Sequence, residues 1–159
     1  MPTIELTTRI NASIEIVFDL SISVDLHKLS TQQTNEEAIA GVTSGLMKLN
    51  DTVTWCAKHL GFYQKLTTKI TQYDRPKSFT DEMVQGIFKS MKHEHHFYDD
   101  ENGTIMKDDF RYVSPLGFLG KIADELFLKK YLTRFLIQRN EMIREYAESD
   151  KWKELINIH

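Results

Sequence analysis

The stretch TIMKDDFRYVSPLGFLGKIADELFLKKYLTRFLIQRNEMIREYAE, residues 104–148, decides the fold of this chain. It predicts a strand over 104–113 and a joint at 114–120, after which apolar residues recur at helical spacing from 122 to 146. The apolar side of this helix carries Leu128, Leu132, Phe135, Leu136, Ile143 and Tyr146. At ~1.5 Å per residue the helix spans roughly 40 Å. A helix of that length needs a large partner, and the hollow face of a curved antiparallel sheet would supply one.

The residues before this stretch read mostly as strands. Alternating side chains predict a first strand over 3–10, and Asn11 or Ser13 and then Ser23 can cap two short helices. The helices are expected at 14–20 and 24–29, and further strands at 34–43, 52–60, 62–73, 78–85 and 89–98. We therefore predict an α+β fold in which an antiparallel sheet of about seven strands wraps around the long C-terminal helix. One domain over 1–148 is expected, followed by a C-terminal tail at 149–159.

Composition narrows the class of protein and its partners. Hydrophobic residues make up 41% of the chain and charged residues 27%, as in ordinary globular proteins. The net charge is −3 and no basic stripe is interleaved with aromatic residues, so nucleic acid is not an expected partner. No apolar run is long enough to span a membrane, and the N-terminus alternates like a strand rather than a signal peptide. Cys56 is the only cysteine, which suits a reducing cytoplasm.

Turn lengths fix which side chains share a face of the sheet. Two-residue turns are expected at 60–61 and at Asn102–Gly103, and a four-residue turn at 74–77. The pairs that these turns set opposite one another are Trp55 with Leu66, Ile70 with Asp81, Phe97 with Asp108, His95 with Phe110 and His93 with Tyr112. The apolar face then carries Val53, Trp55, Leu66, Ile70, Phe79, Met83, Met91, Phe97, Met106, Phe110 and Tyr112.

The same face also carries polar side chains, namely His59, Gln64, Asp81, His93, His95 and Asp108. Each polar group buried without a partner costs on the order of 1–3 kcal/mol. Either these groups pair with one another or the face encloses solvent or a ligand. We favour a cavity; the alternative is that some positions lie at a wet strand end with no functional meaning.

Several segments together resemble a known superfamily. They are Asp81-Glu82-Met83, His93-Glu94-His95-His96-Phe97, Gly103-Thr104-Ile105-Met106-Lys107-Asp108 and Tyr112-Val113-Ser114-Pro115-Leu116-Gly117. With the order of elements, they resemble the START-type or SRPBCC superfamily, and within it the ligand-binding proteins labelled polyketide cyclase/dehydrase-like. The resemblance implies a helix-grip fold with a cavity. Members bind lipids, polyketides, hormones or quinones, and a minority catalyse cyclisation or dehydration, so the fold does not choose a function.

The histidines admit more than one chemistry. His93 and His95 at alternate strand positions have the spacing of some strand-borne zinc sites, with Asp81 or Asp108 as a third ligand. A hydrogen-bonded pair is the commoner meaning of this spacing, and we expect no metal and no cofactor. A carboxylate beside an imidazole also suits acid–base catalysis, or merely a rigid core pair. His27, on a short helix that could close the cavity mouth, and His59, at a strand end, are weaker candidates.

Two functions from different classes remain open. The first is a binding protein for a small hydrophobic or ring-containing molecule, and the second is a cyclase or dehydratase that uses the same polar residues to move protons. An interaction protein acting through its sheet edge or long helix ranks last. The expected cavity residues are Trp55, Asp81, Met83, His93, His95, Phe97, Met106, Asp108, Phe110 and Tyr112.

Overall fold

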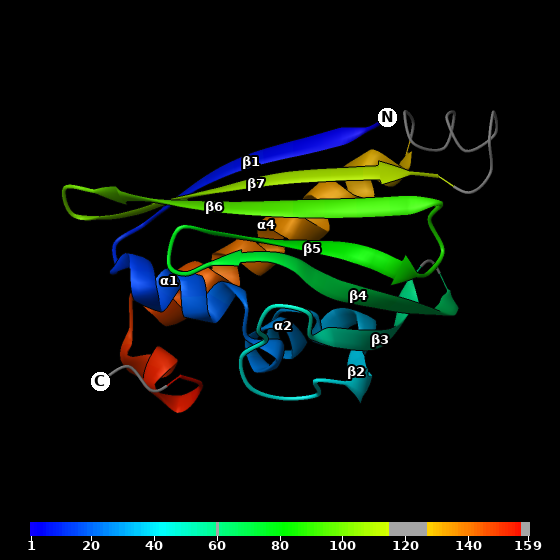
Figure 1. Cartoon of the computed structure of the whole chain (residues 1–159), viewed down its shortest axis with the longest axis horizontal. Helices are drawn as coiled ribbons and strands as arrows, with labels where there is room; N and C mark the ends of the chain where they lie inside the picture. The colour runs from blue at the N-terminus through cyan, green and yellow to red at the C-terminus, as the bar shows by residue number, and fades with distance from the viewer. Residues whose placement is uncertain (60, 115–126, 157–159) are drawn as a thin grey trace.

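The chain folds into a seven-stranded antiparallel sheet that holds a long helix against one face (Figure 1). The computed structural model describes residues 1–59, 61–114 and 127–156. The strands are β1 (Thr3–Ile10), β2 (Glu37–Gly41), β3 (Thr52–His59), β4 (Phe62–Asp74), β5 (Ser78–Gln85), β6 (Ser90–Asp100) and β7 (Gly103–Val113). The helices are α1 (Ile14–Ser21), α2 (Val24–Ser30), α4 (Lys129–Ala147) and the short 3₁₀ helices η1 (Gln32–Thr34) and η3 (Asp150–Glu154). The predicted α+β helix-grip class is confirmed.

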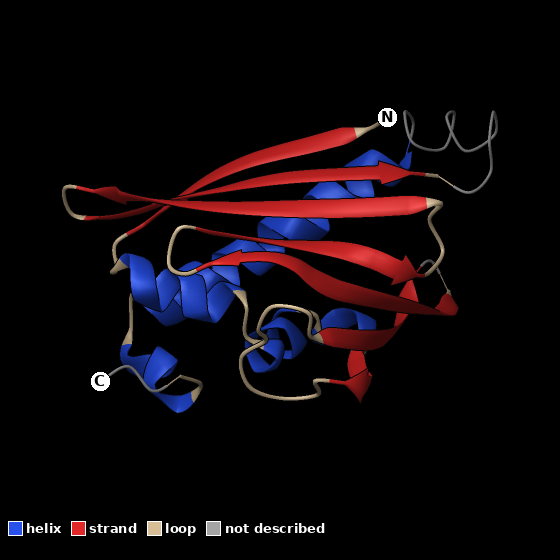
Figure 2. Cartoon of the chain, viewed as in Figure 1, coloured by secondary structure: helices blue, strands red, loops and turns tan. Residues whose placement is uncertain are grey.

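Strand order along the sheet is β1-β7-β6-β5-β4-β3-β2, so the last strand returns beside the first. Figure 2 shows α4 crossing behind the strands, and α1 and α2 both contact it. Both short helices begin where the sequence predicts, because the hydroxyl of Ser13 accepts from the Ile16 amide and that of Ser23 from the Leu26 amide. The helices of the described ranges are all too short or too polar to cross a membrane.

The strand expected at 34–43 is shorter than predicted. Residues 32–34 form η1, and Asn35 takes a left-handed conformation with φ 50°. Strand pairing begins only at Glu37 and contains a bulge between Ala38 and Ala40. The left-handed residue turns the chain out of the extended conformation, which explains why the alternation of 34–36 does not produce a strand.

The central pairings agree with the predicted register. Trp55 lies opposite Leu66, and His59 opposite Phe62, as a two-residue turn at 60–61 requires. Ile70 lies opposite Asp81, although the turn differs from the expected one. Pairing continues to Asp74 and Ser78, so three residues form the turn, and an irregularity between Ile70 and Gln72 restores the register. A shorter turn plus one extra residue gives the same offset as the four-residue turn.

The register of the β6–β7 hairpin was wrong by two residues. Asp100 pairs with Gly103, so the turn is Glu101–Asn102 rather than Asn102–Gly103, and His95 lies opposite Asp108. Gly103 serves a different purpose: a Cβ there would lie 2.3 Å from the Ile10 carbonyl oxygen. Its lack of a side chain lets the end of β1 approach. A shift of two residues keeps each side chain on its face, so the inward set survives the error.

Helix α4 covers the later part of the predicted helix; the predicted joint from 115 onward and the start of that helix, up to 126, lie outside the described residues. Its C-terminal half packs in a core cluster with α1 and α2, around Phe18 and Ile143. Its N-terminal half contacts a second cluster that contains Phe110, Tyr112 and Leu136. Beyond the helix, residues 150–154 form η3 and Ile156 is buried in the first cluster.

Candidate functional site

A cavity of about 220 Å³ lies between the sheet and the N-terminal half of α4. Its wall is mostly apolar and draws on both core clusters, through Val53, Trp55 and Ile70 on one side and Phe110 and Leu136 on the other. Polar side chains interrupt this wall, and they include the predicted Asp81, His93, His95, His59 and Gln64. The expected cavity with polar residues in its lining is therefore present in the fold.

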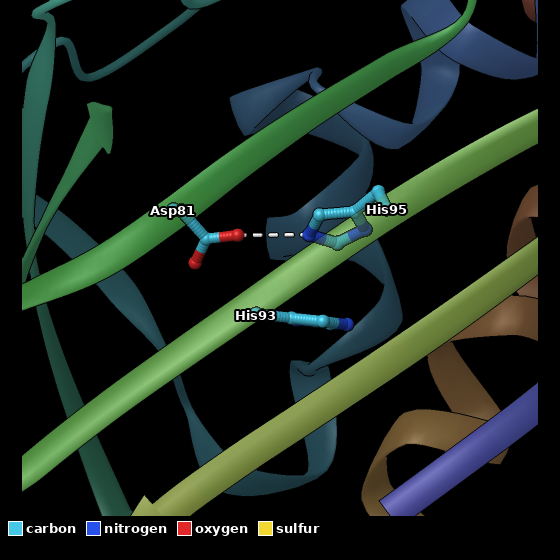
Figure 3. Close-up of side chains that lie close together, drawn as sticks. All are labelled: Asp81, His93 and His95. Atoms are coloured by element: carbon cyan, nitrogen blue, oxygen red, sulfur yellow. Dashed lines mark hydrogen bonds and ion pairs between the residues drawn. The ribbon is translucent and has the colours of Figure 1, made fainter. Parts of the chain in front are cut away.

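Asp81, His93, His95 and Asp108 come together, and we call them the inner polar group. His95 Nε2 lies 2.8 Å from Asp81 Oδ1, and His93 Nε2 lies 2.8 Å from Asp108 Oδ1. Figure 3 shows Asp81 on β5 reaching toward His95 on β6, with His93 beside it. Each histidine thus bonds the carboxylate diagonal to it, since the directly opposed pairs are Asp81 with His93 and His95 with Asp108.

Ring contacts hold both imidazoles in place. The His95 ring stacks on Phe79 with centroids 4.0 Å apart and meets the His93 ring at 3.7 Å. The His93 and Phe110 rings lie nearly perpendicular to each other, at 83°, with centroids 5.2 Å apart. His93 and His95 are 5% and 2% exposed. Ring packing and the hydrogen bonds to Asp81 and Asp108 together hold both imidazoles in place.

Arg139 and Asn140 of α4 anchor the group from the helix side. Arg139 Nη1 donates to Asp108 Oδ1 at 3.2 Å, and Asn140 Nδ2 donates to Asp108 Oδ2 at 2.7 Å. Arg139 also donates to the Ser21 carbonyl at 3.3 Å and lies 3.4 Å from His95 Nδ1. Asp108 therefore accepts hydrogen bonds both from His93 on the sheet and from Arg139 and Asn140 on α4, and these bonds connect the helix to β7.

The electrostatics of the group favour a neutral His93 and ionised carboxylates. Burial and the neighbouring His95 lower the pKa of His93 to about 4. Burial alone would raise the pKa of Asp108, but its hydrogen bonds from His93 and His95 and the Arg139 charge hold that pKa well below its usual value. Burial would also raise the pKa of Asp81, but the hydrogen bond to His95 and the nearby charges outweigh burial and lower that pKa.

These charges assign the protons. His93 donates from Nε2 to the ionised Asp108, so its Nδ1 carries a lone pair. His95 Nε2 lies 2.8 Å from Asp81 Oδ1, and its Nδ1 lies 3.4 Å from Arg139 Nη2 and 3.3 Å from Asp108 Oδ1. Within the described ranges, His93 Nδ1 and Asp81 Oδ2 have no hydrogen-bond partner. The group therefore presents hydrogen-bond acceptors, because its donors are engaged internally.

The residues predicted for the cavity divide into two sets. The cavity wall includes Trp55, Asp81, His93, His95 and Phe110. The others lie behind the wall or in the adjoining core, namely Met83, Phe97, Met106, Asp108 and Tyr112. Asp108 is 2% exposed and acts through the residues it holds. Whether any of these residues contacts a ligand stays a prediction.

Sequence reasoning missed four residues of the site: Glu36, Tyr131, Arg139 and Asn140, of which all but Asn140 line the cavity. Arg139 and Asn140 follow Leu136 by three and four positions, which is the spacing of the buried stripe of α4. Two polar residues in phase with an apolar stripe signal a buried polar partner on the facing sheet. Glu36 carried no comparable signal, because it was assigned to a strand.

Asp81, His93 and His95 can also be considered as metal ligands. One donor atom from each lies within 4.8 Å of the others. A cation would have to displace the His95–Asp81 hydrogen bond and would face the nearby positive charge of Arg139. The geometry therefore suits hydrogen bonding better than ligation, and the absence of a metal stays a prediction.

No protein-family model matches the chain, and no curated protein matches it. Solved structures do match it. Over 92% of this chain and 99% of its own, TTHA0849 from Thermus thermophilus superposes with a TM-score of 0.71 at 15% identity. Major latex-like protein 151 from Panax ginseng gives 0.68 at 15% identity over 93% and 98% of the two chains. The di-domain ARO/CYC StfQ from the steffimycin biosynthetic pathway gives 0.72 at 9% identity, over 92% of this chain and 50% of StfQ.

At these identities the likeness concerns the fold. It extends over nearly the whole chain and agrees with the strand order, the two short helices and the gripped α4 described above. The chain therefore shares the helix-grip fold of these proteins, which is the fold that the resemblance of its sequence motifs implied.

Proposed function

We propose that this protein binds a small hydrophobic or amphipathic molecule, one that contains a ring, in the cavity between the sheet and α4. The observation that supports this most is a mostly apolar cavity whose wall includes a fixed group of hydrogen-bond acceptors. At about 220 Å³ the cavity lies below the ~300–1,000 Å³ usual for drug-sized ligands, so the ligand is small.

The inner polar group would orient the ligand. His93 Nδ1 and Asp81 Oδ2, which are without partners among the described residues, can accept hydrogen bonds from it. Both atoms are held by packing and by bonds on their far side, so binding requires little reordering. The aromatic rings of Trp55 and Phe110 in the wall suit a flat ring.

The second candidate is a cyclase or dehydratase that moves protons with the same residues. The fold admits such chemistry, since one solved neighbour is named an ARO/CYC. A general base works best when its pKa lies near the working pH. His93, with a pKa of about 4, is a poor base at neutral pH, and both nitrogens of His95 are already engaged. These properties favour binding over proton transfer.

A cavity-filling substitution tests the proposal. Ala57 is 3% exposed and lines the cavity, so Ala57→Leu places three additional carbon atoms in the space. Ala40→Leu, on the exposed edge strand β2, is the matched control. We expect 2-methylnaphthalene to bind the wild type and the control, and Ala57→Leu to lose at least tenfold in affinity by fluorescence titration. Equal affinity of all three proteins would show that the probe does not occupy this cavity.

Native mass spectrometry of the purified chain gives an independent measurement. A small molecule that co-purifies with the wild type and is depleted from Ala57→Leu would identify the natural ligand class. Turnover of that molecule by the wild type, lost in His93→Gln with unchanged affinity, would favour the enzyme instead.

A further inference from the structure

A second set of polar side chains lines the same cavity, on elements that do not contribute the inner polar group. Glu36 precedes β2, His27 lies on α2, His59 ends β3 and Tyr131 lies on α4. We call these four residues the outer polar group. His27 Nε2 lies 3.0 Å from Glu36 Oε1, and His59 Nδ1 lies 2.7 Å from the Tyr131 hydroxyl. They form two bonded pairs, and Glu36 lies near enough to influence the ionisation of both His59 and Tyr131.

Glu36 is the incomplete member of this group. Its side chain is 7% exposed, and Oε2 is buried without a hydrogen-bond partner in the described part of the chain. A carboxylate oxygen has room for two hydrogen bonds, and leaving a buried one unsatisfied is unfavourable. The buried Thr71 hydroxyl likewise has no partner among the described residues, but Thr71 does not line the cavity. Glu36 therefore contributes to the cavity lining a carboxylate with one oxygen unsatisfied among the described residues.

The neighbours of Glu36 cannot readily satisfy this oxygen. His27 already faces Oε1, and its ring is held against Trp55 with centroids 4.3 Å apart. His59 is fixed by Tyr131 and by the Phe135 ring at 5.5 Å. Burial lowers the pKa of His59, although the Glu36 charge opposes this, so His59 is neutral at pH 7 and offers no positive charge. The Glu36 carboxylate is thus surrounded by aromatic and imidazole rings, and its Oε2 has no hydrogen-bond partner among the described residues.

We propose that Glu36 Oε2 accepts a hydrogen bond from the ligand, which therefore carries a hydroxyl or a protonated amine on its apolar ring. This inference rests on the function proposed above and adds the chemical class of the ligand's polar end. Arg139 is the one buried cation that lines the cavity among the described residues. Its guanidinium already donates to Asp108, Asn140 and the Ser21 carbonyl, so it is not available to pair with an acidic ligand. A carboxylate ligand would place a second negative charge near Glu36.

Four naphthalenes with one substituent each test this recognition: 2-methylnaphthalene, 2-naphthol, 2-(aminomethyl)naphthalene and 2-naphthoate. Each is titrated into the full chain, into Glu36→Met, which removes the acceptor at equal side-chain length, and into Glu37→Met. Glu37 is the matched control, because it is the next residue and is exposed. The methyl compound measures cavity binding without the donor.

We expect the hydroxyl or the aminomethyl compound to bind the wild type and Glu37→Met about tenfold or more tightly than the methyl compound, and 2-naphthoate to bind more weakly. In Glu36→Met this gain should vanish while the methyl compound binds as before. Which of the two compounds gains identifies the donor as a hydroxyl or an ammonium group. No gain for either, or a gain that persists in Glu36→Met, would overturn the inference and leave the proposed function standing. Failure of all four compounds to bind would overturn both.

Discussion

Asp108→Asn isolates the role of charge at the centre of the fold. The substitution keeps the shape of the side chain but removes the negative charge that Arg139 faces at 3.2 Å. It also turns one acceptor oxygen into a donor, which must then face either the His93 N–H or the Asn140 amide. Asp108 is 2% exposed and Arg139 5%, so water cannot replace the lost interaction.

The expected loss follows from these contacts. Removing one partner of a buried ion pair costs about 3–5 kcal/mol, because the remaining charge stays buried and unpaired. The clash of two donors accounts for about 1–3 kcal/mol within that loss. In a chain of this length the melting temperature should fall by on the order of 10 °C. We therefore predict a loss of about 3–5 kcal/mol in the free energy of unfolding.

Urea titration followed by circular dichroism measures this loss, and Asp109→Asn is the control. Asp109 is the next residue on β7, points to the opposite face and pairs with Arg111 at the surface, where such a pair is worth about 0–1 kcal/mol. The midpoint should drop for Asp108→Asn with an unchanged slope, and hardly move for Asp109→Asn. A loss below about 1 kcal/mol, or equal losses for the two variants, would refute the assignment of Asp108 as the buried anchor of α4.

Three further predictions concern stability. The pKa of His93 falls from 6.5 to about 4 on folding, so between these pH values the unfolded chain binds a proton that the folded chain does not. The free energy of unfolding should therefore fall by roughly 3 kcal/mol through this residue as the pH drops from 6.5 to 4. Urea titrations at several pH values measure this, and a His93→Gln variant that keeps the full slope would contradict it. Ile143→Ala should lower the free energy of unfolding by about 2–5 kcal/mol, and Leu132→Ala should lower it less, because Ile143 is fully buried while Leu132 already borders the cavity. The reverse order in the same urea titration would count against the packing described. Ser23→Ala should cost about 1 kcal/mol by loss of the buried cap of α2, against which an unchanged melting temperature would argue.

The fold could be predicted because its strongest signals are periodic. Alternation over 3–10 and 52–59 and helical spacing after residue 128 each name an element and its buried side. The turn residues were less informative, since Asn102–Gly103 looked like the turn while the glycine was needed for contact with Ile10. Such a contact joins residues far apart in sequence, and no local pattern reveals it.

Strand geometry predicted which polar side chains share a face of the sheet, but not how they pair. Parity brought Asp81, His93 and His95 to one face, and the structure places them there. Which histidine bonds which carboxylate depends on side-chain rotamers and on Arg139, which enters from a different element. Glu36 lines the cavity directly after the left-handed Asn35, and the surrounding sequence did not predict that conformation.

The two halves of α4 have different surroundings, and this gives the helix a mechanical asymmetry. From Arg139 onward it is fastened by the Asp108 bonds and by Ile143 in closely packed core, whereas Tyr131, Leu132 and Phe135 rest against the open space of the cavity. Local opening is easiest where few atoms must separate. Amide exchange should therefore be slow after residue 139 and faster before it.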